Sequence, residues 1–219
     1  MKRLFDILSS LIAIIIFLPI CIIIIFVLKI TGEGEIFYFQ ERIGKNSKKI
    51  RLIKFVTMKK NSPNIGAGDI TLKNDPRVLP FGKILRKTKL NELPQLFNVL
   101  KGDMSVVGPR PLVLNQHNMI PEKYKKNIIK LKPGLSSIGS IIFRDEERFL
   151  AKNNEESNDF YRNEIVPFKA SIENWYFHNN SFFNDIMIII FTVLAILFQN
   201  SNHYKYFFRK LPKHKIFNP

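Results

Sequence analysis

Residues 11–28 read LIAIIIFLPICIIIIFVL, an uncharged run of eighteen residues between Lys2 and Arg3 on one side and Lys29 on the other. At about 1.5 Å of rise per residue, a helix of this length reaches the lower limit for crossing a hydrocarbon core about 30 Å thick. A signal peptide also joins a charged start to an apolar run, but no small-residue cleavage site follows here; residues 31–35 read TGEGE. We therefore expect a retained membrane anchor.

Pro19 lies near the middle of this run. A proline inside a helix removes a backbone hydrogen bond and clashes with the preceding turn, so the sequence predicts a kink. Short positively charged flanks prefer the cytoplasmic side, and here both flanks are positive. A re-entrant helix that bends at Pro19 and returns to its own side satisfies both flanks. An ordinary span with a slight kink fits the same residues equally well.

The rest of the chain is strongly basic. Its 34 lysines and arginines against 18 aspartates and glutamates give a formal net charge of +16. Such an excess lies on the surface and attracts anions: acidic lipids, phosphorylated substrates or nucleic acid. A single cysteine, Cys21, excludes an intrachain disulfide, and the four histidines lack the spacing of metal ligands.

A second apolar segment, residues 186–198, is too short to span a bilayer and predicts either a core helix or a helix at the membrane interface. Residues 203–210, HYKYFFRK, then interleave aromatic and cationic side chains. Membrane-surface segments and nucleic-acid binders share that composition. Beside a membrane anchor, anionic membrane lipids are the expected partner, and no nucleic acid is expected.

The middle of the chain predicts a small hairpin followed by helices. Residues 36–39 and 50–56 are rich in β-branched and aromatic side chains, with turn residues at 44–47 between them. Residues 59–75 are polar and contain Pro63, Gly66 and Gly68, which indicates a loop. Apolar residues then recur at three- and four-residue spacing, as on one face of a helix: Leu90, Leu93, Phe97 and Leu100.

Pro94 limits where that helix can begin. A proline is tolerated only in the first turn, so the helix should begin close to Asn91. Asn91 is then a plausible N-cap, and Glu92 lies in the first turn, where the helix dipole favours a negative charge.

Residues 102–111, GDMSVVGPRP, are hard to fit into regular structure. Pro109 and Pro111 restrict the backbone of Arg110, which predicts a guanidinium held in a fixed direction. Such an arginine suits bidentate recognition of phosphate, and an arginine in a solvated turn is the alternative. The acidic cluster at 145–147 fits either a metal site or the charged start of a helix.

These segments together resemble the bacterial sugar transferase family, specifically the small monotopic phosphoglycosyl transferases. The strongest motif is residues 92–111, ELPQLFNVLKGDMSVVGPRP. The other matching motifs follow in the same order along nearly the whole chain: residues 39–44 (FQERIG), Lys54 and Phe55 with Met58, residues 73–77 (KNDPR), Phe81 and Gly82 with Leu85 and Arg86, and residues 132–135 (KPGL).

The resemblance implies a re-entrant helix with Pro19 as its hinge, on the cytoplasmic face of the bacterial inner membrane. It also implies a Mg²⁺-dependent reaction that moves a sugar phosphate from a UDP-sugar to polyprenol phosphate and releases UMP, the first membrane step of a surface glycan. The residues expected to bind the substrates are Arg86, Pro109, Arg110, Pro111, Lys54 and Arg77. The sequence tells neither the sugar and pathway nor whether the protein works as a homodimer.

One departure from the family affects the catalytic pair. The usual Asp-Glu reads Asn91-Glu92 here, and a neutral amide is a poor nucleophile. Three outcomes stay open. Glu92, Asp103 or Asp145 replaces the lost carboxylate as nucleophile or metal ligand; the two substrates react directly; or the protein is an inactive scaffold that binds nucleotide sugars or partner enzymes. The new carboxylates at 145–147 favour a rearranged active site.

We therefore expect an α+β fold with a re-entrant membrane helix, a short β-hairpin and a mostly helical domain at the membrane interface. The predicted division places the membrane helix at 1–30, the sugar transferase domain at 31–200 and a basic aromatic tail at 201–219.

Overall fold

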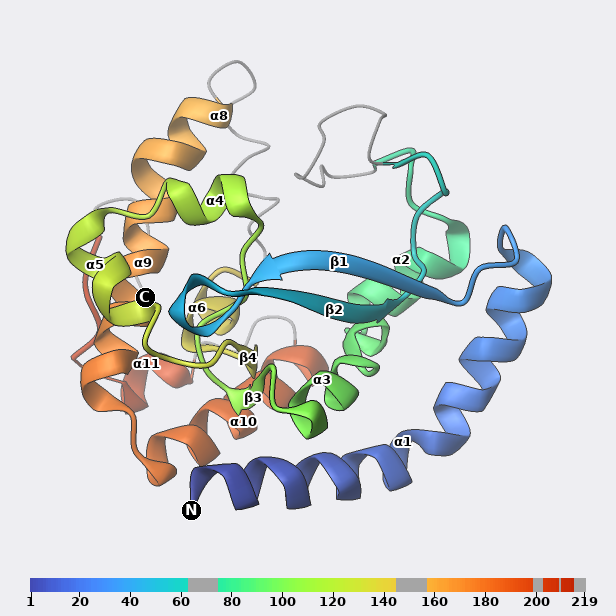
Figure 1. Ribbon diagram of the computed structural model, residues 1–219, viewed down its shortest axis with the longest axis horizontal. Coiled ribbons are helices and arrows are strands. Elements are labelled where there is room, and N and C mark those ends of the chain that lie inside the picture. Colours follow the sequence, from blue (N-terminus) through green and yellow to red (C-terminus); the bar gives the residue numbers. More distant parts are fainter. Residues whose placement is uncertain (63–74, 145–156, 199–202, 209, 215–219) are drawn as a thin grey trace.

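The computed structural model describes residues 1–62, 75–144, 157–198, 203–208 and 210–214, and it has the expected α+β architecture (Figure 1). The α-helices are α1 (Lys2–Thr31), α2 (Pro80–Lys87), α3 (Gln95–Lys101), α4 (Leu114–Asn118), α5 (Glu122–Ile128), α6 (Ile138–Ile142), α8 (Ser157–Phe160), α9 (Val166–Asn179), α10 (Phe182–Leu197) and α11 (Tyr204–Phe207). Shorter turns of other helix types are η1 (Lys45–Ser47), η3 (Leu90–Glu92) and η4 (Tyr161–Ile165). The strands are β1 (Phe37–Ile43), β2 (Lys49–Phe55), β3 (Ser105–Val107) and β4 (Gly134–Ser136).

Helix α1 is long, apolar and bent. Pro19 lies inside it, and Figure 1 shows the helix running along one side of the molecule and then turning midway. It is the one helix of the described chain that is long and apolar enough to cross a membrane. Only 11% of its most apolar stretch of 18 residues is buried. A core helix of a soluble domain would be mostly buried, so we identify α1 as a membrane helix.

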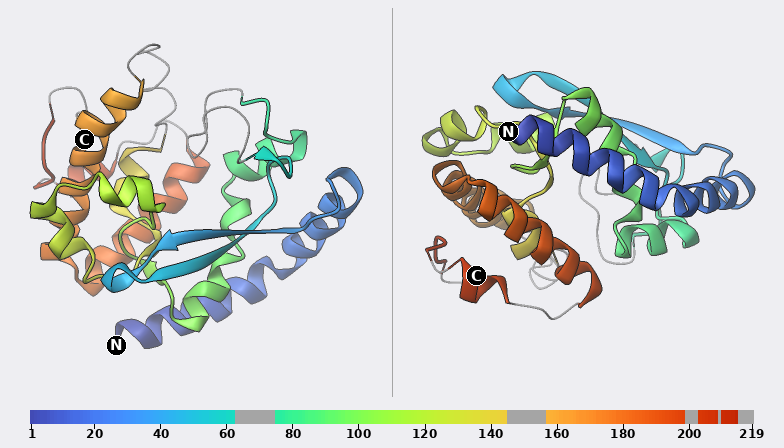
Figure 2. Two further views of the ribbon diagram at one scale, coloured as in Figure 1. Left: turned by 45° about the horizontal axis from the view of Figure 1, so that its top comes forward. Right: turned by 90° about the horizontal axis from the view of Figure 1, so that it is seen from below.

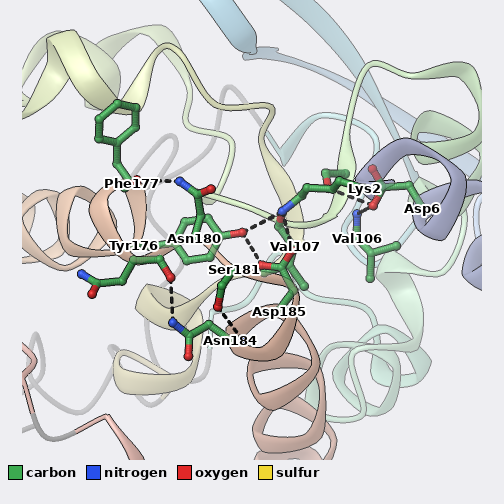
Figure 3. Close-up of polar contacts among 12 residues, drawn as sticks. Lys2, Asp6, Val106, Val107, Tyr176, Phe177, Asn180, Ser181, Asn184 and Asp185 are labelled. Carbon is green, nitrogen blue, oxygen red and sulfur yellow. Dashed lines mark hydrogen bonds and ion pairs between the residues drawn. The ribbon is translucent and has the colours of Figure 1, made fainter.

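Polar contacts fix the first arm of α1 to the body of the protein (Figure 3). The Lys2 ammonium donates to Tyr176 Oη at 2.8 Å and pairs with Asp185 Oδ2 at 2.7 Å. The buried Asp6 carboxylate accepts hydrogen bonds from Ser105 Oγ and from the N–H of Val106, both at 2.9 Å. These bonds satisfy polar groups that would otherwise be costly beside a bilayer.

Apolar contacts fix the second arm of α1 to the same body. Ile24 and Leu28 are buried in a cluster with Phe55 of β2 and Leu85 of α2. A straight span would separate the two ends of the helix by the membrane thickness, about 30 Å. Here both ends contact one domain, which is the geometry that a re-entrant helix requires.

The predicted hairpin is confirmed, and a second pair of strands was not predicted. Strands β1 and β2 pair antiparallel, with Phe39 opposite Ile53. The segment 102–111, expected to be irregular, contains β3, which pairs in parallel with β4. Each of these strands has only three residues, which is too few to show the alternation of apolar and polar residues by which a strand is predicted.

The helix predicted to begin near Asn91 begins later. Residues 90–92 form the tight turn η3, and α3 begins at Gln95 with Pro94 as its N-cap. The turn arises because Lys89 adopts a left-handed backbone with φ of 61° and Leu93 donates to the carbonyl of Leu90 at 3.2 Å. The N-cap prediction for Asn91 was therefore wrong.

Helix α10 is half-buried. Its inner face contributes Ile188, Phe191 and Ala195 to the core, whereas Val193 and Leu197 are exposed. Figure 1 places α1 and α10 along the same face of the molecule, and Figure 2 shows both helices crossing that face when it is viewed from below. Further along the chain, three residues of the predicted tail lie in the core: Tyr204, Phe208 and Leu211.

Candidate active site

A cavity of about 470 Å³ opens between the β-hairpin, η3, the turn after β3, and helices α6 and α9. Seven of the residues predicted to bind or react with substrate line it: Lys54, Arg77, Arg86, Asn91, Glu92, Pro109 and Arg110. They come from segments up to 56 positions apart in the chain, counting from Lys54 to Arg110. The fold thus assembles most of the predicted site in one place.

An ion pair lies at the centre of this group. Arg110 Nη2 is 3.0 Å from Glu92 Oε1, and the Glu92 side chain is only 12% exposed. A guanidinium held by a carboxylate keeps a fixed direction, and its planar fork of donors matches the geometry of a phosphate. The expectation that Arg110 is rigidly presented therefore has a physical basis in this contact.

Two close backbone approaches position the turn that carries Arg110. Gly108 and Gly134 pack back to back where β3 and β4 pair: a Cβ on Gly134 would lie 2.1 Å from the Gly108 nitrogen. The N–H of Gly134 also donates to the Pro109 carbonyl at 2.9 Å. Only glycine fits at such a distance, so both glycines are needed to hold the turn against the cavity.

The charges around Glu92 set its protonation. Burial by itself raises the pKa of the Glu92 carboxyl, but the surrounding cations outweigh that effect and the pKa falls to about 2. Those cations are Arg110, Lys54 and Lys89. Glu92 is therefore a carboxylate at every physiological pH.

The pKa values of two lysines beside it are lowered as well, which for a lysine favours the neutral form. Burial lowers the pKa of Lys54 to about 7, although the Glu92 charge raises it. Burial and the charge of Arg110 also lower the pKa of Lys89. Both ammonium groups would gain stability from an incoming anion, so the cavity suits a ligand that brings phosphate charge. Lys89 was missed because nothing in the sequence marks its left-handed backbone.

Asn91 is buried beside this pair, and it lines the cavity. Within the described part of the chain, its Oδ1 has no hydrogen-bond partner. A buried amide oxygen without a partner destabilises the folded protein, and a ligand or cation bound to it would recover that free energy.

The remaining predicted residues lie differently. Arg77 is at the cavity wall, but its guanidinium forms a buried pair with Asp75, with Nη2 2.6 Å from Oδ2. Pro111 and Asp103 are outside the lining, and Asp103 pairs with Lys101 at 3.0 Å. Asp145 lies outside the described residues.

Sequence reasoning also missed Glu173, a buried carboxylate of α9 that lines the cavity. Its carboxylate accepts hydrogen bonds from the Ser137 side chain and from the N–H groups of Arg110 and Gly139. The one signal was an acidic residue directly after Ile172 and close to Trp175 and Tyr176, in a helix rich in aliphatic and aromatic side chains.

Comparison with known proteins identifies the family of this assembly. The model of the bacterial sugar transferase family matches residues 1–199. The undecaprenyl-phosphate galactose phosphotransferase of Salmonella typhimurium is 34% identical over 215 residues, which are 90% of this chain and 40% of that protein. The UDP-N-acetylgalactosamine-undecaprenyl-phosphate N-acetylgalactosaminephosphotransferase of Aeromonas hydrophila is 33% identical over 205 residues, 90% of this chain and 43% of that protein.

A shorter relative has a length similar to this chain. The exopolysaccharide production protein ExoY of Rhizobium meliloti is 29% identical over 217 residues, 92% of this chain and 88% of that protein. The chain thus spans less than half of the two phosphotransferases and most of ExoY. With the family model matching nearly the whole chain, this protein belongs to the bacterial sugar transferase family.

Proposed function

We propose that this protein transfers a sugar phosphate from a UDP-sugar to polyprenol phosphate, the undecaprenyl form being the acceptor, and releases UMP. The reaction would be the first membrane step of surface glycan synthesis. Two of the relatives are named for phosphotransfer to undecaprenyl phosphate. The observation that carries the proposal is the Glu92–Arg110 pair, set among Lys54 and Lys89 at one cavity.

The cations of the cavity suit phosphoryl transfer. The reaction spreads negative charge over the transferred phosphoryl oxygens, so catalysis depends on positioning and on neutralising that charge. Arg110 and Arg86 would bind the diphosphate, and Lys54 would be fully charged once an anion is present. Glu92 keeps Arg110 in place while the substrate exchanges.

Mg²⁺ is the cation we expect at this site, and the side chains present fit it. The unpartnered Asn91 Oδ1 and the ionised Glu92 carboxylate offer oxygen ligands, although the described residues contain no group of three His, Cys, Asp or Glu able to hold a metal. Mg²⁺ is commonly bound by one or two protein oxygens, with water and substrate phosphates as the other ligands. When bound, it would neutralise charge on the diphosphate.

The membrane geometry supports access to a lipid acceptor. Both arms of α1 contact the same domain, and α1 and α10, which both carry exposed apolar side chains, lie along one face of the molecule (Figure 2). We place this face in the cytoplasmic leaflet of the bacterial inner membrane, where the basic surface would also attract anionic lipids. Pro19 would act as the membrane hinge, and the division at residues 30 and 200 stays a prediction.

Asn91 favours a second candidate, a catalytically inactive scaffold that binds nucleotide sugars or partner enzymes. An amide cannot form the phosphosugar–enzyme intermediate that a carboxylate forms. The two candidates differ in one measurable product, UMP.

The experiment measures UMP release by the purified protein in lipid nanodiscs with Mg²⁺ and a panel of UDP-sugars, with and without undecaprenyl phosphate. We expect release that depends on the acceptor, since Asn91 removes the usual nucleophile. Arg110→Gln is the matched variant and should lose turnover. Binding of a UDP-sugar without release, for every sugar tried, would select the scaffold.

A further inference from the structure

Glu173 differs from every other carboxylate of the cavity in how its oxygens are used. It is 8% exposed, and three donors hold its carboxylate: the side chain of Ser137 and the N–H groups of Arg110 and Gly139. Its Oε2 is buried and lacks a hydrogen-bond partner in the described part of the structure. An unpartnered buried polar atom costs about 1–3 kcal/mol, so its presence at a cavity wall needs an explanation.

Close packing fixes the direction of this carboxylate. A Cβ on residue 139 would lie 2.5 Å from Glu173 Oε1, so the glycine makes room for it. The same donors connect Glu173 to the Arg110 turn, which places the carboxylate at the wall where substrate phosphates would bind. One oxygen is thus held, and the other is left for a ligand.

Among the described residues, Lys169, one turn earlier on α9, is a cation whose charge acts on Glu173. Some of the other ionisable groups on α9 and on its neighbours α5 and η4 form pairs of their own: Tyr176 with Asp185, Lys125 with Glu122, and Glu164 with His214. These elements also carry His178, Lys123, Lys126 and Arg162. Burial therefore dominates and raises the pKa of Glu173 to about 7, against the lowering effect of its hydrogen bonds.

We propose that Glu173, rather than Glu92, accepts the proton of the acceptor phosphate. This inference rests on the proposed function. Glu92 is permanently ionised and bound to Arg110, so it has little affinity for a proton. Two carboxylates in one site whose environments drive their proton affinities apart take different roles, one as a fixed charge and one as a base.

The step balances without any further reactant. The polyprenol phosphate monoanion gives its proton to Glu173 Oε2, and the phosphate oxygen forms a bond to the β-phosphorus of the UDP-sugar. The bond from that phosphorus to the bridging oxygen breaks, and UMP leaves with the electron pair. Glu173 then releases the proton to water. A phosphate monoester has a second pKa of about 6, close enough to that of Glu173 for efficient transfer.

The test compares wild type with Glu173→Gln, a variant of nearly the same shape. UMP release is measured in nanodiscs with undecaprenyl phosphate from about pH 5 to about pH 8. We expect the deficit to be largest near pH 5, about 10-fold or more, because the acceptor is then mostly the monoanion and its proton must be removed. The deficit should shrink to less than about 2-fold above pH 7.5, because the acceptor is then already doubly ionised.

A second acceptor and a control sharpen the result. A polyprenyl phosphorothioate, which loses its last proton at lower pH, should restore the variant at lower pH than the phosphate does. Glu122→Gln on α5 should match wild type throughout. Thermal unfolding and UDP-sugar binding verify that the variant is folded, and Glu173→Asp, which keeps a carboxylate, replaces it if it is not.

The outcomes separate the two proposals. An active wild type with no deficit in Glu173→Gln, or with a deficit equal at every pH, overturns the proton role and leaves the transferase intact. A phosphosugar found on Glu173 by peptide mass spectrometry, when the acceptor is omitted, also overturns it in favour of a nucleophile. No UMP release by wild type and Glu122→Gln alike overturns the transferase proposal and this inference with it.

Discussion

The two walls of the cavity each carry a buried glutamate, and the pKa is lowered at one wall and raised at the other. At η3, Glu92 is paired with Arg110 and surrounded by lysines, which lower its pKa to about 2. At α9, Glu173 has mainly neutral donors, and burial raises its pKa to about 7. The contrast shows that the partners supplied by the fold, and not the residue type, decide whether a carboxylate is a fixed charge or a proton acceptor.

The largest effect should follow Glu92→Gln. Loss of this charge removes the ion pair of Arg110 and an oxygen ligand for Mg²⁺, so we expect turnover to fall about 10²–10³-fold. The assay uses saturating UDP-sugar, whose diphosphate keeps Lys54 charged; because Glu92 is also ionised across the assay range, the deficit should be the same from about pH 6 to about pH 9. UMP release across that range is the measurement, with Glu41→Gln on the exposed hairpin as control. A deficit that shrinks with rising pH would give Glu92 the proton role assigned to Glu173.

Asn91→Asp should change when UMP appears. The new carboxylate would lie beside Glu92, at the position where the family has its nucleophile, and could attack the β-phosphorus directly. We expect up to about one UMP per protein when the acceptor is omitted, and none from wild type. Rapid-quench measurement and the intact mass of the protein detect the intermediate. Equal release by wild type would mean that another residue already acts as the nucleophile.

The two walls of the cavity also differ in how far the sequence could predict them. The bend in α1, the hairpin and the turn that carries Arg110 were predictable because proline, strand patterns and motifs are local signals. The turn at η3 depends on one left-handed residue, Lys89, and the β3–β4 pair depends on the contact between Gly108 and Gly134. Glu173 joins the site through contacts with segments more than thirty residues away, at Ser137 and Arg110, which no local pattern records.

Folding stability should separate the two carboxylates by the sign of their pH dependence. The raised pKa of Glu173 means that its ionised form penalises the folded state: the penalty is absent below its unfolded pKa of about 4.3 and complete above about pH 7. Glu173→Gln should therefore gain on the order of 2 kcal/mol relative to wild type above pH 7, and this gain should disappear near pH 4.

Glu92 should behave in the opposite way. Its lowered pKa stabilises the fold above about pH 4.3, and that stability is lost as the pH falls toward 2. Glu92→Gln should thus be less stable than wild type at neutral pH. Chemical unfolding in detergent at several pH values measures both variants. The same sign for both would show that the two environments do not differ as described.

The smallest effect concerns Lys169, a cation of α9 whose charge acts on Glu173. Lys169 lowers the Glu173 pKa, so Lys169→Met, which keeps the apolar stem, should raise it further. The pH at which Glu173→Gln has its largest deficit in UMP release is measured with Lys169 intact and in the Lys169→Met background. That pH should rise by less than about one unit when Lys169 is replaced. Because Glu92 is governed by Arg110, Lys54 and Lys89, its pH-independent deficit should not respond to Lys169. A shift in the Glu92 deficit as well would mean that the two walls are electrostatically one site, and that the division of roles between them fails.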